Sequence, residues 1–206
     1  MKGAVARHIW AVPFEIAMVC GAVATFSQGN WKHFAASLFT LAVSFLPIPF
    51  ERWFRVMLPA WVQASYVAFV FVSFFSGEVL RMYGRIWVWD DIMHFLSGFL
   101  VGIGVMLWLV MLGRRVKKFH VPVWFGALFI LLTSMGVATA WELVEFGSDE
   151  IFGTFTQGAD LFDTMLDLVY QTTSGLVMAA LWVAHCHWGK VPLMSFLIRQ
   201  FERLNR

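Results

Sequence analysis

The seven residues from Trp89 to Phe95, WDDIMHF, place two carboxylates and an imidazole at the beginning of a long apolar run. Asp90 precedes His94 by four positions, and Asp91 precedes it by three. Residues that are three or four positions apart lie on one face of a helix, so either carboxylate can lie beside the imidazole. The segment therefore predicts a helix whose first turns carry a polar face able to share a proton or hold a cation.

Two later segments carry further acids at helical spacing. Glu142 and Glu145 are three positions apart, and Asp149 follows Glu145 by four. Another stripe advances by three, four and four positions and consists of Asp160, Asp163, Asp167 and Gln171. Each set falls on one face of a helix. If the three segments meet at one end of a bundle, their acids form a single cluster.

Such a cluster cannot be fully ionised, because carboxylates a few ångströms apart repel one another. It must hold protons, recruit an arginine or bind a cation. Oxygen ligands with one imidazole suit zinc, manganese or ferrous iron, and oxygens alone suit calcium or magnesium. We expect a divalent metal ion, and the alternative is a metal-free network of interhelical hydrogen bonds and protonated carboxyls. The expected ligands are Asp90, Asp91, His94, Glu142, Glu145, Asp163 and Asp167, with Glu78, Asp149, Asp160 and Gln171 as a second tier.

The composition indicates the solvent around these helices. Of the 206 residues, 60% are hydrophobic and 14% are charged, whereas roughly a quarter of the residues of a soluble domain are charged. The apolar runs show no alternation with a period of two, and a bilayer admits only helices or closed barrels. The chain is therefore predicted to be an all-α, polytopic membrane protein that contacts the lipid bilayer, with no nucleic-acid partner.

Six apolar runs are long enough to cross a bilayer. They cover residues 9–27, 33–50, 56–77, 91–113, 121–146 and 161–186. Short connectors predict one transmembrane domain over 1–190. The tail, 191–206, carries apolar residues opposite arginines, which predicts an amphipathic helix on the cytoplasmic surface. Its apolar residues are Leu193, Leu197, Phe201 and Leu204.

The basic residues predict the orientation of the bundle. Twelve of the fifteen Lys and Arg residues fall on the side of the two termini, which the positive-inside rule assigns to the cytoplasm. We expect a protein of the bacterial inner (plasma) membrane whose acidic cluster faces outward. The basic segment 114–118 would also attract anionic lipid headgroups.

The first run carries polar residues of its own. Pro13 and Glu15 interrupt it, so we expect a retained helix and not a cleaved signal peptide. Glu15 is expected to pair with a neighbouring basic side chain, and His8 is expected to be an ordinary interface residue.

Several stretches resemble a known family. They are Gly77-Glu78, Arg81-Met82-Tyr83, WDDIMHFLSGF (89–99), WELVEFGSDEIFG (141–153), Gln157-Gly158 and DTMLDL (163–168). They are similar to the YjdF-like family of uncharacterised bacterial inner-membrane proteins, over about residues 77–175. A looser likeness to VanZ-like membrane proteins serves as a fold-level analogy. In the family pattern an Asn stands four positions after the second Asp, where this chain has Gln171.

The resemblance brings no established activity, and it implies that six residues of the cluster act as one unit. These are Asp90, His94, Glu142, Glu145, Asp163 and Asp167. Three functions agree with the sequence. The first is binding of a divalent cation, and the second is a metal-dependent enzyme acting on a lipid or envelope substrate, with Glu142 or Glu145 as general base. The third is a proton- or cation-coupled carrier, although the two halves show no internal repeat. No nucleophile is recognisable, so no catalytic residue is assigned.

Overall fold

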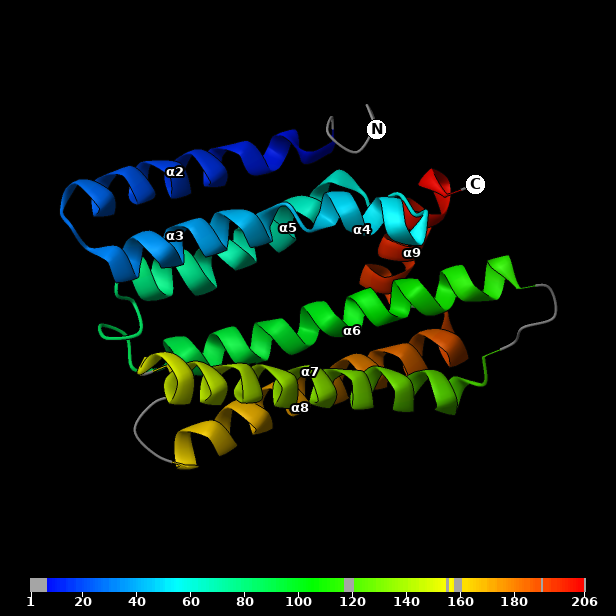
Figure 1. The fold of residues 1–206 in the computed structure, drawn as a ribbon. Helices are drawn as coiled ribbons and strands as arrows, with labels where there is room; N and C mark the ends of the chain where they lie inside the picture. The colour runs from blue at the N-terminus through cyan, green and yellow to red at the C-terminus, as the bar shows by residue number, and fades with distance from the viewer. Residues whose placement is uncertain (1–6, 117–120, 155, 158–160, 190, 206) are drawn as a thin grey trace. The chain divides into compact units, whose positions relative to one another are not determined.

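The computed structural model describes residues 7–116, 121–154, 156–157, 161–189 and 191–205. All the regular secondary structure in these residues is helical (Figure 1), which confirms the predicted all-α fold. The elements are η1 (Ile9–Ala11), α2 (Val12–Ser27), α3 (Trp31–Ser44), α4 (Pro47–Phe54), α5 (Ala60–Val70), η2 (Phe71–Val79), α6 (Trp89–Arg115), α7 (Val123–Phe152), α8 (Leu161–Trp188) and α9 (Pro192–Leu204).

Five helical segments are long and apolar enough to cross a membrane and match the first five predicted spans. They are Ile9–Ser27, Trp31–Phe54, Ala60–Val79, Trp89–Arg115 and Val123–Phe152. The sixth predicted span corresponds to α8, which is 28 residues long. Its first half carries Asp163, Asp167 and Gln171, which lower its mean hydropathy. Polar side chains at such positions are expected to face the bundle interior and find partners there.

Local sequence signals explain two helix boundaries that the apolar runs do not reveal. The second span is divided into α3 and α4, and Pro47 lies in the first turn of α4, where a missing amide donor costs little. The side chain of Asn30 caps α3 by accepting a hydrogen bond from the amide of His33 at 3.2 Å. The third span begins as α5 and ends as the π-helix η2.

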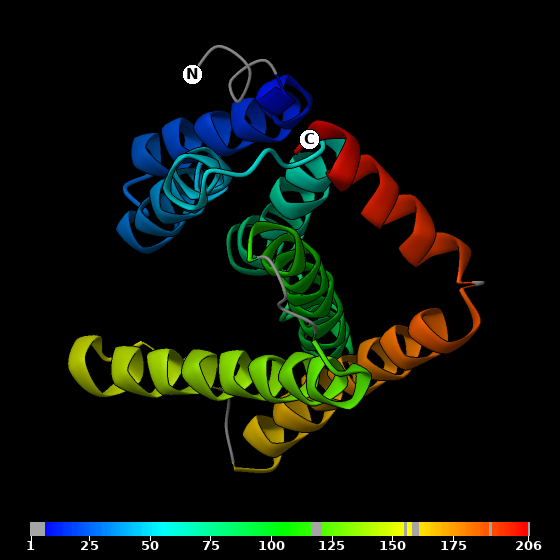
Figure 2. The same ribbon diagram turned by 90° about the vertical axis from the view of Figure 1, so that its right-hand side faces the viewer.

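The contacts divide the chain into two compact units. The first contains Met1–Trp89 together with Gln200–Arg206. In this unit α2 and α3 lie side by side in both views (Figures 1 and 2). The side chain of Asn205, just after α9, accepts a hydrogen bond from the amide of Met57 at 2.7 Å and donates one to its carbonyl at 2.8 Å. The tail thus forms the predicted helix, while its place at a membrane surface and the domain boundary at 190 stay predictions.

The second unit, Asp90–Arg199, contains α6, α7 and α8. The helices α7 and α8 are in extensive contact and cross each other (Figure 2). Small residues permit the close approach, because a Cβ on Gly98 of α6 would collide with Ser174 of α8. A Cβ on Gly175 would lie 2.6 Å from the Cβ of Ser134 in α7. Such small-residue contacts are typical of helix packing in membranes.

The direction of the three helices decides where the acids lie. The chain turns back between α6 and α7 and again between α7 and α8, so the beginning of α6, the end of α7 and the beginning of α8 share one end of the unit (Figure 1). These are the three helix ends that carry the acidic stripes.

Candidate metal site

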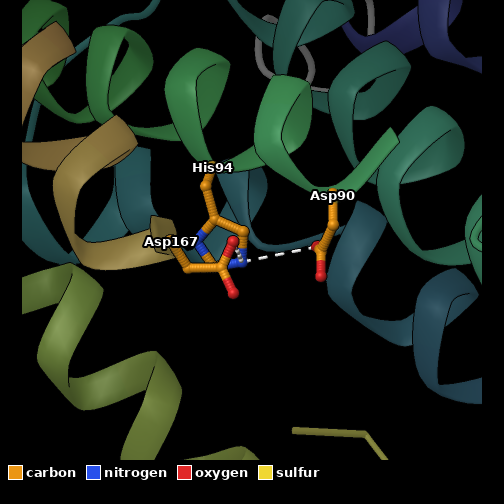
Figure 3. Close-up of side chains that lie close together, drawn as sticks. All are labelled: Asp90, His94 and Asp167. Atoms are coloured by element: carbon orange, nitrogen blue, oxygen red, sulfur yellow. Dashed lines mark ion pairs between the residues drawn. The ribbon is translucent and has the colours of Figure 1, made fainter. Parts of the chain in front are cut away.

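Asp90 and His94 of α6 meet Asp167 of α8 at this end (Figure 3). Nε2 of His94 lies 3.5 Å from Oδ1 of Asp90 and 3.7 Å from Oδ1 of Asp167. One ligand atom from each residue lies within 4.8 Å of the other two. We call these three residues the triad.

The distances within the triad fit a shared cation better than direct hydrogen bonds. An N–H···O hydrogen bond joins its heavy atoms at about 2.7–3.2 Å, which is shorter than both separations from Nε2. Two nitrogen or oxygen ligands about 2.0–2.2 Å from a tetrahedral zinc lie about 3.3–3.6 Å apart. The triad therefore has the spacing of a set of metal ligands.

Burial makes the triad costly without a positive partner. His94 is 6% exposed and Asp167 is 4% exposed. Nδ1 of His94 and Oδ1 of Asp167 make no hydrogen bond with any residue that the structure describes. An unsatisfied buried polar group costs about 1–3 kcal/mol, and a charged one costs more. A proton or a cation among these atoms would remove that cost.

Glu142 of α7 is a further buried acid of the same cluster and is 6% exposed. Thr164 and Gln157 lie close enough to interact with it, but neither carboxylate oxygen reaches hydrogen-bond geometry with a described residue. The charge of Glu142 acts on both Asp90 and Asp167. Glu142 is therefore next to the triad and free to accept a proton or contact a cation.

The remaining first-tier acids surround this centre. The charges of Asp91 and Asp163 act on Asp90, and Glu145 interacts with the charges of Asp90 and Asp167. All three side chains are partly exposed. The structure thus gathers the seven first-tier residues in one electrostatic neighbourhood and brings three of them to ligand distance. Metal ligation by any of them stays a prediction.

The second-tier acids have other positions. Glu78 belongs to the first unit, where Nζ of Lys32 lies 2.9 Å from its Oε1. Asp149 holds the turn after α7 through hydrogen bonds with Thr154 and Thr156. Asp160 lies outside the described residues. Gln171 is buried one helical turn beyond Asp167.

Sequence reasoning missed the serines that tie this end of the unit together. Ser134 donates to the carbonyl of Gln171 at 3.2 Å, and Ser174 donates to the same carbonyl at 2.9 Å. Small residues at contact spacing were the available signal, but small residues also occur on faces without contacts. Beyond these serines the fully buried side chains are apolar and include Met106, Ile130 and Met178.

These features define an all-helical membrane protein with a buried cluster of acids and one histidine at one end of three helices. The chain belongs to the family described as "Predicted membrane protein (DUF2238)", whose model matches residues 6–188. This is the YjdF-like family, so the resemblance seen around the acidic stripes is confirmed and also covers the first two spans.

The relatives show no activity that could be transferred. An uncharacterised protein of Thermotoga maritima is 26% identical over 135 residues, which cover 66% of this chain and 68% of that protein. No solved structure matches the chain.

Proposed function

We propose that this membrane protein binds a divalent cation through Asp90, His94 and Asp167. The observation that carries the proposal is the convergence of three ligand atoms within 4.8 Å of one another. Two of the three side chains are buried and hold unpartnered polar atoms. Two carboxylates balance the charge of a divalent ion, and the imidazole favours zinc, manganese or ferrous iron over calcium. Glu142 is the nearest candidate for a fourth ligand.

The cation site is proposed to face the outer side of the plasma membrane. Support comes from the excess of Lys and Arg on the side of the termini, which the positive-inside rule assigns to the cytoplasm. The triad lies at the opposite ends of the helices, at the beginning of α6 and α8. The basic segment after α6 would then face the anionic lipid headgroups of the inner leaflet.

A metal-dependent enzyme is the second candidate, and Glu142 favours it. A bound metal lowers the pKa of water, and a buried carboxylate with both oxygens free is placed to take the proton. The substrate would be a lipid or another envelope molecule. A carrier receives less support, because the buried Met106, Ile130 and Met178 continue the core beyond the polar region.

The decisive experiment measures metal content and affinity in the purified protein. After chelation and reloading with zinc or manganese, the wild-type chain should bind one ion, and the His94→Ala, Asp167→Asn double variant should bind none. His187→Ala and Glu150→Gln change an exposed histidine and an exposed acid and should leave binding unchanged. A folded wild-type protein that binds neither ion at micromolar concentration would overturn the proposal.

The enzyme candidate needs a separate measurement. Glu142→Gln should retain the metal and lose turnover of envelope lipids in reconstituted vesicles. Equal turnover by this variant and the wild type would remove Glu142 as the base.

A further inference from the structure

The amide of Gln171 has one chemically consistent orientation. Its Nε2 lies 3.2 Å from the backbone carbonyl of Ser134 in α7. A carbonyl only accepts hydrogen bonds, so the nitrogen of the amide must face it. The oxygen Oε1 therefore faces α6, where the hydroxyl of Ser97 donates to it at 2.9 Å. Partners on two helices thus fix both ends of this buried side chain.

The fixed oxygen lies beside the histidine of the triad. The side chain of Gln171 interacts with the imidazole of His94, and an amide oxygen has two lone pairs, of which Ser97 uses one. Nε2 of His94 faces the two carboxylates, and Nδ1 is buried without a hydrogen bond to a described residue. Figure 3 shows Nε2 at the ion pairs and the other ring nitrogen on the side of the ring away from Asp90.

The imidazole therefore has acceptors on both sides. A nitrogen that faces an amide oxygen must carry a hydrogen, which assigns the proton of a neutral ring to Nδ1. The lone pair then belongs to Nε2, which points at two carboxylates. A lone pair in that position is repelled unless a positive charge lies between the three groups.

We propose that Gln171 is a positioning residue that holds His94 with its proton on Nδ1 and presents the lone pair of Nε2 to the cation. The inference rests on the proposed cation site and assigns Gln171 a role beside the metal in place of direct ligation. Groups that accept the second N–H of a ligating histidine fix its tautomer and ring orientation. Their loss commonly weakens metal binding about 10–100-fold.

Two substitutions separate positioning from a purely structural role. Gln171→Met removes the amide at similar length, and Gln171→Glu keeps an acceptor toward His94 while losing the donor to Ser134. Both variants lose the bond to α7, so both should unfold more easily than the wild type. Zinc affinity should fall about 10–100-fold only in Gln171→Met. Ser97→Ala removes the other donor to Oε1 and should leave zinc affinity close to that of the wild type.

A spectroscopic measurement tests the bond without relying on affinity, which the added charge of Gln171→Glu also changes. In zinc-loaded protein with ¹⁵N-labelled histidine, the Nδ1 proton of His94 should exchange slowly in the wild type and in Gln171→Glu. It should exchange rapidly in Gln171→Met, and His94→Ala assigns the signal.

The two proposals fail in different ways. Tight zinc binding with a slowly exchanging Nδ1 proton in Gln171→Met would show that Gln171 only supports packing, and the cation site would stand. A folded wild-type protein that binds no zinc or other divalent ion would overturn the cation site and the positioning role together.

Discussion

Oδ1 of Asp149 accepts a hydrogen bond from the backbone amide of Thr156 at 2.8 Å, across the turn that follows α7. The same oxygen accepts the hydroxyls of Thr154 at 2.6 Å and Thr156 at 2.8 Å, and Oδ2 accepts from the amide of Gln157 at 3.0 Å. Gly153 reverses the chain before this turn with a φ of 63°. An acid with so many donors is occupied, and its position explains how Gln157 is kept near Glu142.

Asp149→Ala should therefore loosen the turn after α7 and leave the cation site filled. Loss of four acceptor contacts should speed amide hydrogen exchange at Thr156 and Gln157 severalfold and increase proteolysis of the turn. Glu150→Ala changes the exposed neighbouring acid and is the control. Loss of the bound metal from Asp149→Ala with normal exchange in the turn would instead identify Asp149 as a ligand.

Two glycines of α6 offer a matched test of helix packing. A Cβ on Gly98 would collide with the side chain of Ser174, whereas a Cβ on Gly104 would meet nothing within 4 Å. Gly98→Ala should lower the free energy of unfolding by about 1–3 kcal/mol through overpacking. Gly104→Ala should leave it unchanged or raise it by up to about 1 kcal/mol, because Ala favours helix.

Unfolding in mixed micelles of mild detergent and dodecyl sulfate provides the measurement. Equal effects of the Gly98 and Gly104 substitutions would contradict the close approach of α6 and α8 at Gly98.

Helical periodicity accounts for the part of the site that could be predicted from the sequence. The four-residue spacing of Asp90 and His94 is retained because α6 is an uninterrupted helix from Trp89 to Arg115. Alternation of helix direction then brings Asp167 to the same level. Neither step depends on side-chain detail, so composition and spacing were sufficient.

The fates of the other acids depended on partners that spacing does not specify. Glu78 has a lysine partner on α3, and Asp149 is claimed by the backbone of a turn whose shape depends on Gly153. The division of the second span and the π-helix after α5 likewise arise from local backbone geometry inside continuous apolar runs. Hydropathy averages over such features and cannot locate them.

The first unit contains a buried ionisable pair that tests the remaining sequence expectations. Nε2 of His8 lies 2.6 Å from Oε1 of Glu15, and Ser44 donates to the same oxygen at 3.2 Å. The basic partner expected for Glu15 is thus present. The expectation that His8 is an ordinary interface residue is wrong, because His8 is buried and its ring packs beside Phe45.

Glu15→Ala should destabilise the first unit without affecting the cation site. Removing one partner of a buried pair costs about 3–5 kcal/mol, because the other group is left unpaired. Glu15→Gln keeps an oxygen for His8 and Ser44 and should cost less. The same mixed-micelle titration measures both, and metal content should be that of the wild type. A stability equal to the wild type in Glu15→Ala would show that the pair contributes nothing to folding.

The orientation of the bundle can be measured by thiol labelling, because the only cysteines, Cys20 and Cys186, can be replaced by serine. Glu150 near the end of α7 and Arg115 at the end of α6 are both exposed and lie at opposite helix ends. In spheroplasts, Glu150→Cys should react with a membrane-impermeant maleimide, and Arg115→Cys should react only after permeabilisation. Replacing one of twelve basic residues leaves the charge bias intact. The reverse labelling pattern would place the triad at the cytoplasmic face, where cytosolic metal pools and not the external medium would supply the ion.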